Sequence, residues 1–178
     1  MATQKAPKLT TDKVTSALMY YFIYSLNGVL GKTHLQKLMF LSDLLASKKF
    51  NGPISKMKYV RYTHGPYSWA LDDYINGLKE KEYIEQREFP ITTDPRKSYS
   101  RFYLNKKVDV KTFLLTKLGA AKMLLIDEIV QSYGNKSLQE VLDIVYSLEE
   151  VKRTKHETPI QLAQKMQHSE EDMDDIPF

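Results

Sequence analysis

Nine residues near the start of the chain, Lys32-Thr33-His34-Leu35-Gln36-Lys37-Leu38-Met39-Phe40, carry the pattern of an amphipathic helix. The run Thr33 to Gln36 matches a capping box, in which a Thr hydroxyl and a Gln side chain satisfy the first backbone N–H groups of a helix. Apolar side chains then recur at helical spacing as far as Leu45. Because Asn51-Gly52-Pro53 interrupts this pattern, we predict a helix from Thr33 to about Lys48.

Short elements are predicted on both sides of this helix. A first helix spans Thr11 to Leu26, with Thr11 as its N-cap and Asn27-Gly28 as its stop. After it, residues 56–62 alternate like a short strand. The run His64-Gly65-Pro66-Tyr67 predicts a tight turn, and Ser68 is placed to cap a third helix.

The second half of the chain predicts a β-hairpin and further helices. Residues 83–85 and 98–104 are aromatic-rich runs on either side of an Asp94-Pro95 turn. Asp109 caps a long helix that reaches about Tyr133, and Ser137 to Glu140 forms another capping box.

A helix followed by a two-stranded hairpin is the layout of a winged-helix domain. We therefore expect a single, mainly α domain that is winged-helix-like and has a small β-hairpin. An OB-fold barrel is excluded, because it needs many short strands and Gly-rich turns, whereas this chain has 7 Gly among 178 residues.

Two of these runs resemble the Panacea (SocA-like antitoxin) domain and the related YwgA-type proteins. Lys32 to Phe40 is similar to the opening of the family's motif, and Tyr62 to Ser68 is similar to its Gly-Pro turn. The order of motifs extends the resemblance over roughly residues 10–150. The residues that carry it most directly are Leu35, Gln36, Lys37, Leu38, Gly65, Pro66 and Tyr67. The resemblance implies a non-catalytic module that binds protein, as antitoxins beside diverse toxins in phages and other mobile elements do.

The charge of the chain is divided between a basic body and an acidic end. Residues 1–169 hold 26 Lys and Arg against 17 Asp and Glu, a net charge of +9, while residues 170–175 hold five carboxylates. A basic body attracts polyanions, and an acidic segment can compete with them in a salt-dependent way. Acidity of this density cannot build a core.

The last nine residues resemble the C-terminal tip of bacterial single-stranded-DNA-binding proteins (SSB), which recruits replication and repair enzymes. An acidic run there is followed by Asp-Asp-Ile-Pro-Phe. We expect Phe178 to fill an apolar pocket on such an enzyme, with basic residues around its rim. The predicted docking residues are Asp172, Asp174, Asp175, Ile176, Pro177 and Phe178. A charged solubility tail or an appended tag is the alternative, and an SSB-like end departs from the Panacea pattern.

The chain is expected to divide into four parts. These are a flexible N-terminus (1–9), the helical domain (10–150), a weakly helical linker (151–168) with a helix at most from Pro159 to Gln167, and a disordered acidic docking tail (169–178). No apolar run approaches the roughly 20 residues of a membrane helix, and no signal segment is present, so we expect a cytoplasmic protein without a membrane partner.

Nothing in the sequence predicts an enzyme. The chain has no Cys, and its four histidines, His34, His64, His156 and His168, lack the spacing of metal ligands. No phosphate-binding loop, nucleophile elbow or dinucleotide fingerprint is present. We therefore expect no catalysis, no cofactor and no metal.

The predicted hairpin suggests nucleic-acid binding. Alternation places Tyr99, Arg101 and Tyr103 on one face, opposite Phe102 and Leu104, so the trio could stack unpaired bases. The predicted contact residues are Lys56, Lys58, Arg61, Arg96, Lys97, Tyr99, Arg101, Tyr103, Lys106 and Lys107. The alternative is an ordinary amphipathic hairpin whose tyrosines pack at the rim of the core.

The sequence is consistent with three functions. In the first, the chain is a DNA-metabolism protein, associated with phages or mobile elements, that binds single-stranded DNA and recruits replication and repair enzymes through its tail. In the second, it is a Panacea-type antitoxin or inhibitor that binds a toxin and mimics the SSB tail. The third is a winged-helix transcriptional regulator, which Asp72-Asp73 on the candidate recognition helix disfavours.

Overall fold

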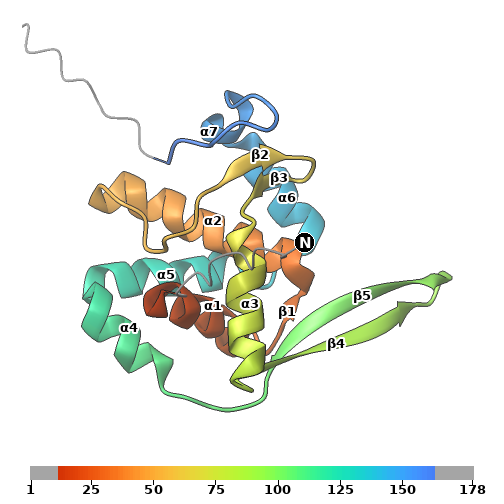
Figure 1. Cartoon of the computed structure of the whole chain (residues 1–178). Helices are drawn as coiled ribbons and strands as arrows, with labels where there is room; N and C mark the ends of the chain where they lie inside the picture. Colours follow the sequence, from red (N-terminus) through yellow and green to blue (C-terminus); the bar gives the residue numbers. More distant parts are fainter. Residues whose placement is uncertain (1–11, 163–178) are drawn as a thin grey trace, which may run out of the picture.

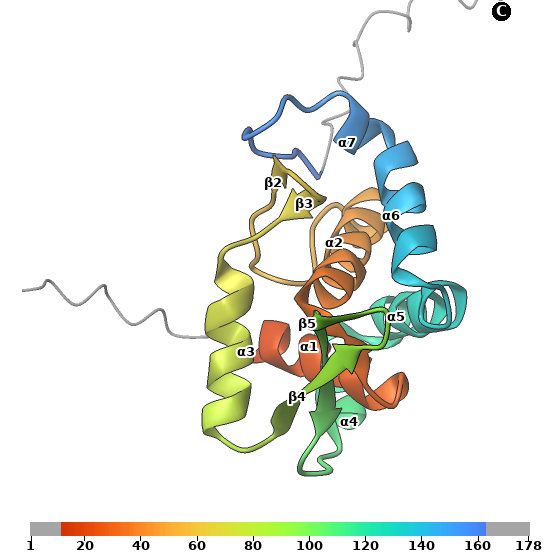
Figure 2. The same ribbon diagram turned by 90° about the vertical axis from the view of Figure 1, so that its right-hand side faces the viewer.

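A buried helix, α2 (Gly31–Phe50), runs through the middle of the molecule (Figures 1 and 2). The computed structural model describes residues 12–162. The other helices are α1 (Lys13–Ser25), α3 (Ala70–Glu80), α4 (Val110–Leu118), α5 (Ala120–Tyr133), α6 (Leu138–Ser147) and α7 (Glu149–Lys152). The strands are β1 (Val29–Leu30), β2 (Val60–Tyr62), β3 (Gly65–Tyr67), β4 (Ile84–Ile91) and β5 (Asp94–Leu104).

Helix α2 is buried on nearly all sides, because α1, α5, α6 and strand β3 pack around it. Leu35, Leu38 and Leu44 are fully buried and form the centre of the hydrophobic core. A helix in this position is normally apolar all round. This one also buries polar side chains, and those side chains organise the candidate site described below.

The main sheet has the strand order β1-β5-β4 and is antiparallel throughout. Val29 of β1 pairs with Phe102 of β5, whose ring is fully buried against the helices. The β4–β5 hairpin extends outward from the helical body (Figure 1). The expected mainly α fold with a small hairpin after α3 is confirmed, and no barrel is present in residues 12–162.

The predicted N-cap of the first helix was wrong by one residue, and the predicted start of the second helix was wrong by two. Asp12 is the N-cap of α1, where its carboxylate accepts a hydrogen bond from Thr15 N at 2.9 Å. Helix α2 begins at Gly31, directly after β1, so Thr33 lies inside the helix and forms no capping box. The pairing of β1 with β5 fixes the start of α2, and that long-range contact is not visible in a local pattern.

A second hairpin, β2–β3, replaces the short strand predicted at residues 56–62 and the tight turn predicted after it. Only Val60–Tyr62 is strand, and Tyr62 pairs with Gly65 across a turn at residues 63–64. Gly65 has a φ of +78°, a left-handed conformation that Gly adopts without strain. Ser68 does not cap α3, because Trp69 holds the N-cap position without a side-chain hydrogen bond.

The long helix predicted from Asp109 is two helices. Asp109 does cap α4, but Gly119 has a φ of +81° and separates α4 from α5. In the β4–β5 hairpin the turn lies at residues 92–93, so Asp94 and Pro95 belong to β5 and not to the turn. The predicted capping box at Ser137 and Glu140 is present at the start of α6.

The described residues after α7 return to strand β2. Ile160 N donates to Tyr59 O at 2.9 Å, and Pro159 forms a β-bridge with Val60. The helix expected from Pro159 is absent from its described part, residues 159–162, where Pro159 and Ile160 pair with the chain at the start of β2. None of the helices in residues 12–162 combines the length and hydropathy needed to cross a lipid bilayer.

Candidate functional site

The motif residues of α2 hold the β2–β3 hairpin in place. Lys37 is almost fully buried, and its Nζ donates to Pro66 O at 2.7 Å. Gln36 Nε2 donates to Ser68 O at 3.1 Å. Burial lowers the pKa of the Lys37 ammonium to about 8. The adjacent pair Gln36-Lys37 therefore joins the central helix to the chain on both sides of Tyr67.

A buried carboxylate on the same helix anchors the segment that leads into β2. Asp43 accepts hydrogen bonds from Ile54 N at 2.9 Å, from Ser55 N at 2.7 Å and from Tyr59 OH at 2.7 Å. The Ser55 hydroxyl donates to Asp43 Oδ2 at 2.5 Å. Burial raises the pKa of Asp43, although the four donors oppose that rise. Asp43 thus fixes residues 54–59 before the hairpin begins.

A groove of about 350 Å³ opens between the start of α2, the β2–β3 hairpin and the start of α3. Its lining includes Lys32, Lys37, His64, Tyr67, Leu71 and Asp72. Lys32 Nζ lies 2.6 Å from Asp72 Oδ1, so this ion pair neutralises the acidic residue of the wall. Two of the three Lys37 N–H donors have no protein acceptor in the described residues. We call this groove the lysine groove.

Four aromatic rings gather beside the lysine groove, and we call them the aromatic cluster: Tyr62, Tyr67, Trp69 and His156. The Tyr67 and Trp69 rings meet edge to face with centroids 5.2 Å apart, and His156 stacks on Tyr62 at 5.6 Å. Trp69 is 61% exposed and Tyr62 is 40% exposed. Exposed aromatic groups of this size are typical of surfaces that bind another molecule.

The predicted stacking trio lies on the β4–β5 hairpin in the arrangement that alternation required. Tyr99 is exposed and stacks on Phe89 across the hairpin, with ring centroids 5.4 Å apart. Arg87 and Arg101 lie over the Tyr103 ring at 4.9 and 5.6 Å. The rings and arginines of this face therefore contact one another.

Acidic neighbours pair with several of the basic residues predicted around that trio. Arg96 and Lys97 both bind the carboxylate of Asp94, at 3.2 and 3.7 Å. Lys106 Nζ lies 3.0 Å from Glu82 Oε2. Lys107 is exposed, with no acidic partner in the described residues. Intramolecular pairing of this kind reduces the positive charge that phosphates would meet.

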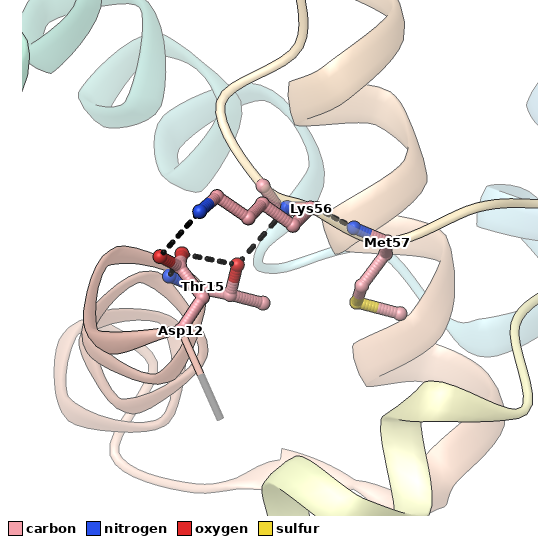
Figure 3. Close-up of polar contacts among 5 residues, drawn as sticks. Asp12, Thr15, Lys56 and Met57 are labelled. Carbon is pink, nitrogen blue, oxygen red and sulfur yellow. Dashed lines mark hydrogen bonds and ion pairs between the residues drawn. The ribbon is translucent and has the colours of Figure 1, made fainter. Parts of the chain in front are cut away.

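The other predicted basic edge, before and within β2, is also held by the fold. Lys56 Nζ lies 3.5 Å from Asp12 Oδ1, and its backbone N–H donates to the Thr15 hydroxyl (Figure 3). Arg61 donates to the Thr154 carbonyl at 2.6 Å. Lys58 is exposed. This edge lies near β2, whereas the trio lies on the β4–β5 hairpin, so the ten residues do not form one continuous patch (Figure 1).

The buried histidine of α2 has no hydrogen-bond partner in the described residues. His34 is buried in α2, where burial lowers its pKa and neither ring nitrogen has a partner. Within residues 12–162 no three His, Asp or Glu side chains gather closely enough to hold a metal ion. The predicted docking residues from Asp172 to Phe178 lie outside the described residues.

The aromatic cluster is the feature that sequence reasoning missed. Its signal was present, because Tyr62, Tyr67 and Trp69 lie within eight residues of one another. Interpreting residues 64–67 as a tight turn hid the fact that two short strands bring these rings together. His156 contacts Tyr62 from 94 residues further along the chain, and no local pattern indicates that contact.

One comparison with known proteins gave a match. The sequence model of the family described as "Antitoxin SocA-like, Panacea domain" matches residues 35–150, which include the motif residues of α2, the β2–β3 hairpin and helices α3 to α6. No match was found among curated proteins or among solved structures.

Proposed function

The chain belongs to the SocA-like, Panacea-domain antitoxin family, and on that premise we propose that it is an antitoxin that neutralises a cognate toxin by binding it. The aromatic cluster and the lysine groove beside it are the observation that supports this proposal, and we assign the toxin-binding surface to them. Tyr and Trp are enriched at the centres of protein interfaces, where a few rings supply most of the binding energy.

The buried polar contacts under this surface support a role in recognition. A binding site on short strands needs support from below, since two three-residue strands have little stability of their own. Lys37 and Gln36 bond the hairpin and its exit, and Asp43 anchors its entry. The family motif in α2 therefore presents the aromatic cluster in a fixed geometry.

The charge distribution favours this function over single-stranded-DNA binding. Five of the ten residues predicted to contact DNA, Lys56, Arg61, Arg96, Lys97 and Lys106, bind acidic side chains or backbone carbonyls of the chain itself. In residues 12–162, the side chains of Tyr62 and Trp69 contact other rings of the cluster and form no hydrogen bond or ion pair. A protein surface can contact these rings without a high density of positive charge.

The direct test is co-expression of the chain with the protein encoded by the neighbouring gene, with growth as the measurement. Growth arrest by that protein should be relieved by the wild-type chain. The double variant Tyr62→Ala, Trp69→Ala should lose this relief, because removing two central aromatic groups costs about 2 kcal/mol or more of binding energy.

The matched control is Tyr99→Ala, since Tyr99 is also an exposed tyrosine, 42% accessible, but lies on the other hairpin. It should relieve the arrest as the wild type does. A neighbouring protein that arrests growth and is relieved equally by the double variant would refute the assignment of the surface. A chain that relieves no arrest and forms no complex with that protein would refute the antitoxin function.

A further inference from the structure

Two neighbouring rings of the aromatic cluster, Tyr62 and Trp69, are exposed to solvent in the described residues. Trp69 is the most exposed of its members. An apolar surface of this kind promotes non-specific association when it stays open to water. A segment of the same chain that covered these rings would prevent such association.

The chain passes this surface again at the end of the described residues. His156 stacks on Tyr62, and Glu157 N donates to Arg61 O. Ile160 N donates to Tyr59 O, in the residue that precedes β2. Figure 2 shows the chain after α7 passing beside β2. Residues 163–178 are consequently attached beside the aromatic cluster. The seven residues from 163 to 169 can span at most about 25 Å, which is ample for a return to the adjacent rings.

The composition of residues 170–178 complements that surface. The segment holds five carboxylates together with Met173, Ile176 and Phe178. Lys155 is exposed and directly precedes His156 of the aromatic cluster, and Lys58 is exposed two residues before β2. The described residues carry 23 basic against 17 acidic side chains, a net charge of +6. Apolar groups can meet the rings while carboxylates meet the lysines.

The first eleven residues are a poorer complement to the same surface. They contain Lys5 and Lys8 and no acidic residue, so the net positive charge of residues 12–162 would repel them. They also join the fold at α1, whereas residues 163–178 begin beside β2. Both its charge and its point of attachment therefore favour residues 170–178 over residues 1–11 as the segment that covers the aromatic cluster.

We propose that residues 170–178 bind across the aromatic cluster and the lysine groove of their own chain, and that a toxin must displace them. Attachment beside the site gives the segment an effective concentration on the order of 1 mM, so a contact with a dissociation constant of about 1 mM would already be half formed. The displacement step rests on the proposed antitoxin function, but the contact itself does not. The segment would shield the rings and set a threshold affinity for the toxin.

Trp69 provides a direct measurement, because it is the only Trp in the chain and lies in the aromatic cluster. The experiment is acrylamide quenching of Trp69 fluorescence in the full-length protein at low salt and in 1 M NaCl. The double variant Ile176→Ala, Phe178→Ala should be quenched about twofold more strongly than the wild type at low salt. In 1 M NaCl, where the screening length falls to about 3 Å, the wild type should approach the variant.

The control is Met166→Ala, which changes an apolar side chain near the segment but outside it and should be quenched as the wild type is. Equal quenching of wild type and double variant at low salt would overturn the proposal, because it would show that Ile176 and Phe178 do not shield Trp69. Protection of Trp69 that disappears on tenfold dilution would also overturn it, in favour of a second copy of the chain as the occupant.

The assay contains no toxin, so it separates the two proposals. Protected Trp69 without relief of growth arrest would retain the contact and refute the antitoxin function. Relief of growth arrest with unprotected Trp69 would retain the antitoxin function and refute the contact between residues 170–178 and the aromatic cluster. If both hold, the double variant Ile176→Ala, Phe178→Ala should bind the toxin about twofold more tightly than the wild type, because half of the wild-type sites are occupied.

Discussion

Asp43 shows how one residue supports the candidate site from inside the core. Its carboxylate is buried and satisfies two backbone N–H groups and the hydroxyls of Ser55 and Tyr59. We expect Asp43→Ala to lower the free energy of unfolding by about 3 kcal/mol or more, since several buried donors lose their acceptor. Urea denaturation measures this. Asp143→Ala, at an exposed carboxylate of α6, should change the value by less than about 0.5 kcal/mol; equal midpoints for the two variants would contradict the role of Asp43.

Lys37 makes a prediction about pH. Burial lowers the pKa of its ammonium in the folded protein to about 8, below the ordinary value of 10.5. Between these two values the unfolded chain holds more protons than the folded chain, so stability contributed through Lys37 rises with pH. From pH 8 to 10, the free energy of unfolding of the wild type should increase by roughly 2 kcal/mol relative to Lys37→Met. Parallel urea curves for both proteins over this range would show that the folded pKa is not lowered.

At the scale of elements, Gly119 separates two helices that a hydrophobic pattern joins. Its φ of +81° favours Gly, and no atom lies within 4 Å of a Cβ built there. The substitution Gly119→Ala should therefore cost about 1 kcal/mol through the backbone alone. Gly52→Ala is the matched control, because that position is equally open but has no positive φ. Thermal unfolding should distinguish them, and an unchanged midpoint for Gly119→Ala would mean that α4 and α5 can join without cost.

The β2–β3 hairpin shows the limit of local reasoning at the same scale. Its two strands have three residues each, which is too short for a pattern of alternation. They are stabilised by Lys37 and Gln36 of α2 and by residues 157–160, all distant in the sequence. The motif residues were identified correctly from the sequence, but their role as supports for the aromatic cluster follows only from these contacts.

At the scale of the whole molecule, net charge is a weaker guide than its distribution. The ten residues predicted to contact DNA are divided between the β2 region and the β4–β5 hairpin, and several bind acidic groups of the chain. We expect a labelled oligo(dT) to bind no more tightly than about 10⁻⁵ M at physiological salt, as non-specific contacts do. Fluorescence anisotropy measures this. Submicromolar, salt-sensitive binding that is lost in Arg101→Ala would restore the first of the three functions considered from the sequence.

The sequence by itself determined the mainly α fold, the β4–β5 hairpin with Phe102 inside and Tyr99 outside, the family motif in α2 and the capping box of α6, because short-range periodicity and capping encode each of them. Only the tertiary structure decided where α2 begins, which charges are paired and that His156 meets Tyr62. These features depend on contacts between residues far apart in the chain, whose free energy exists only once the core has formed. The aromatic cluster belongs to this second group, and with it the surface on which the proposed function rests.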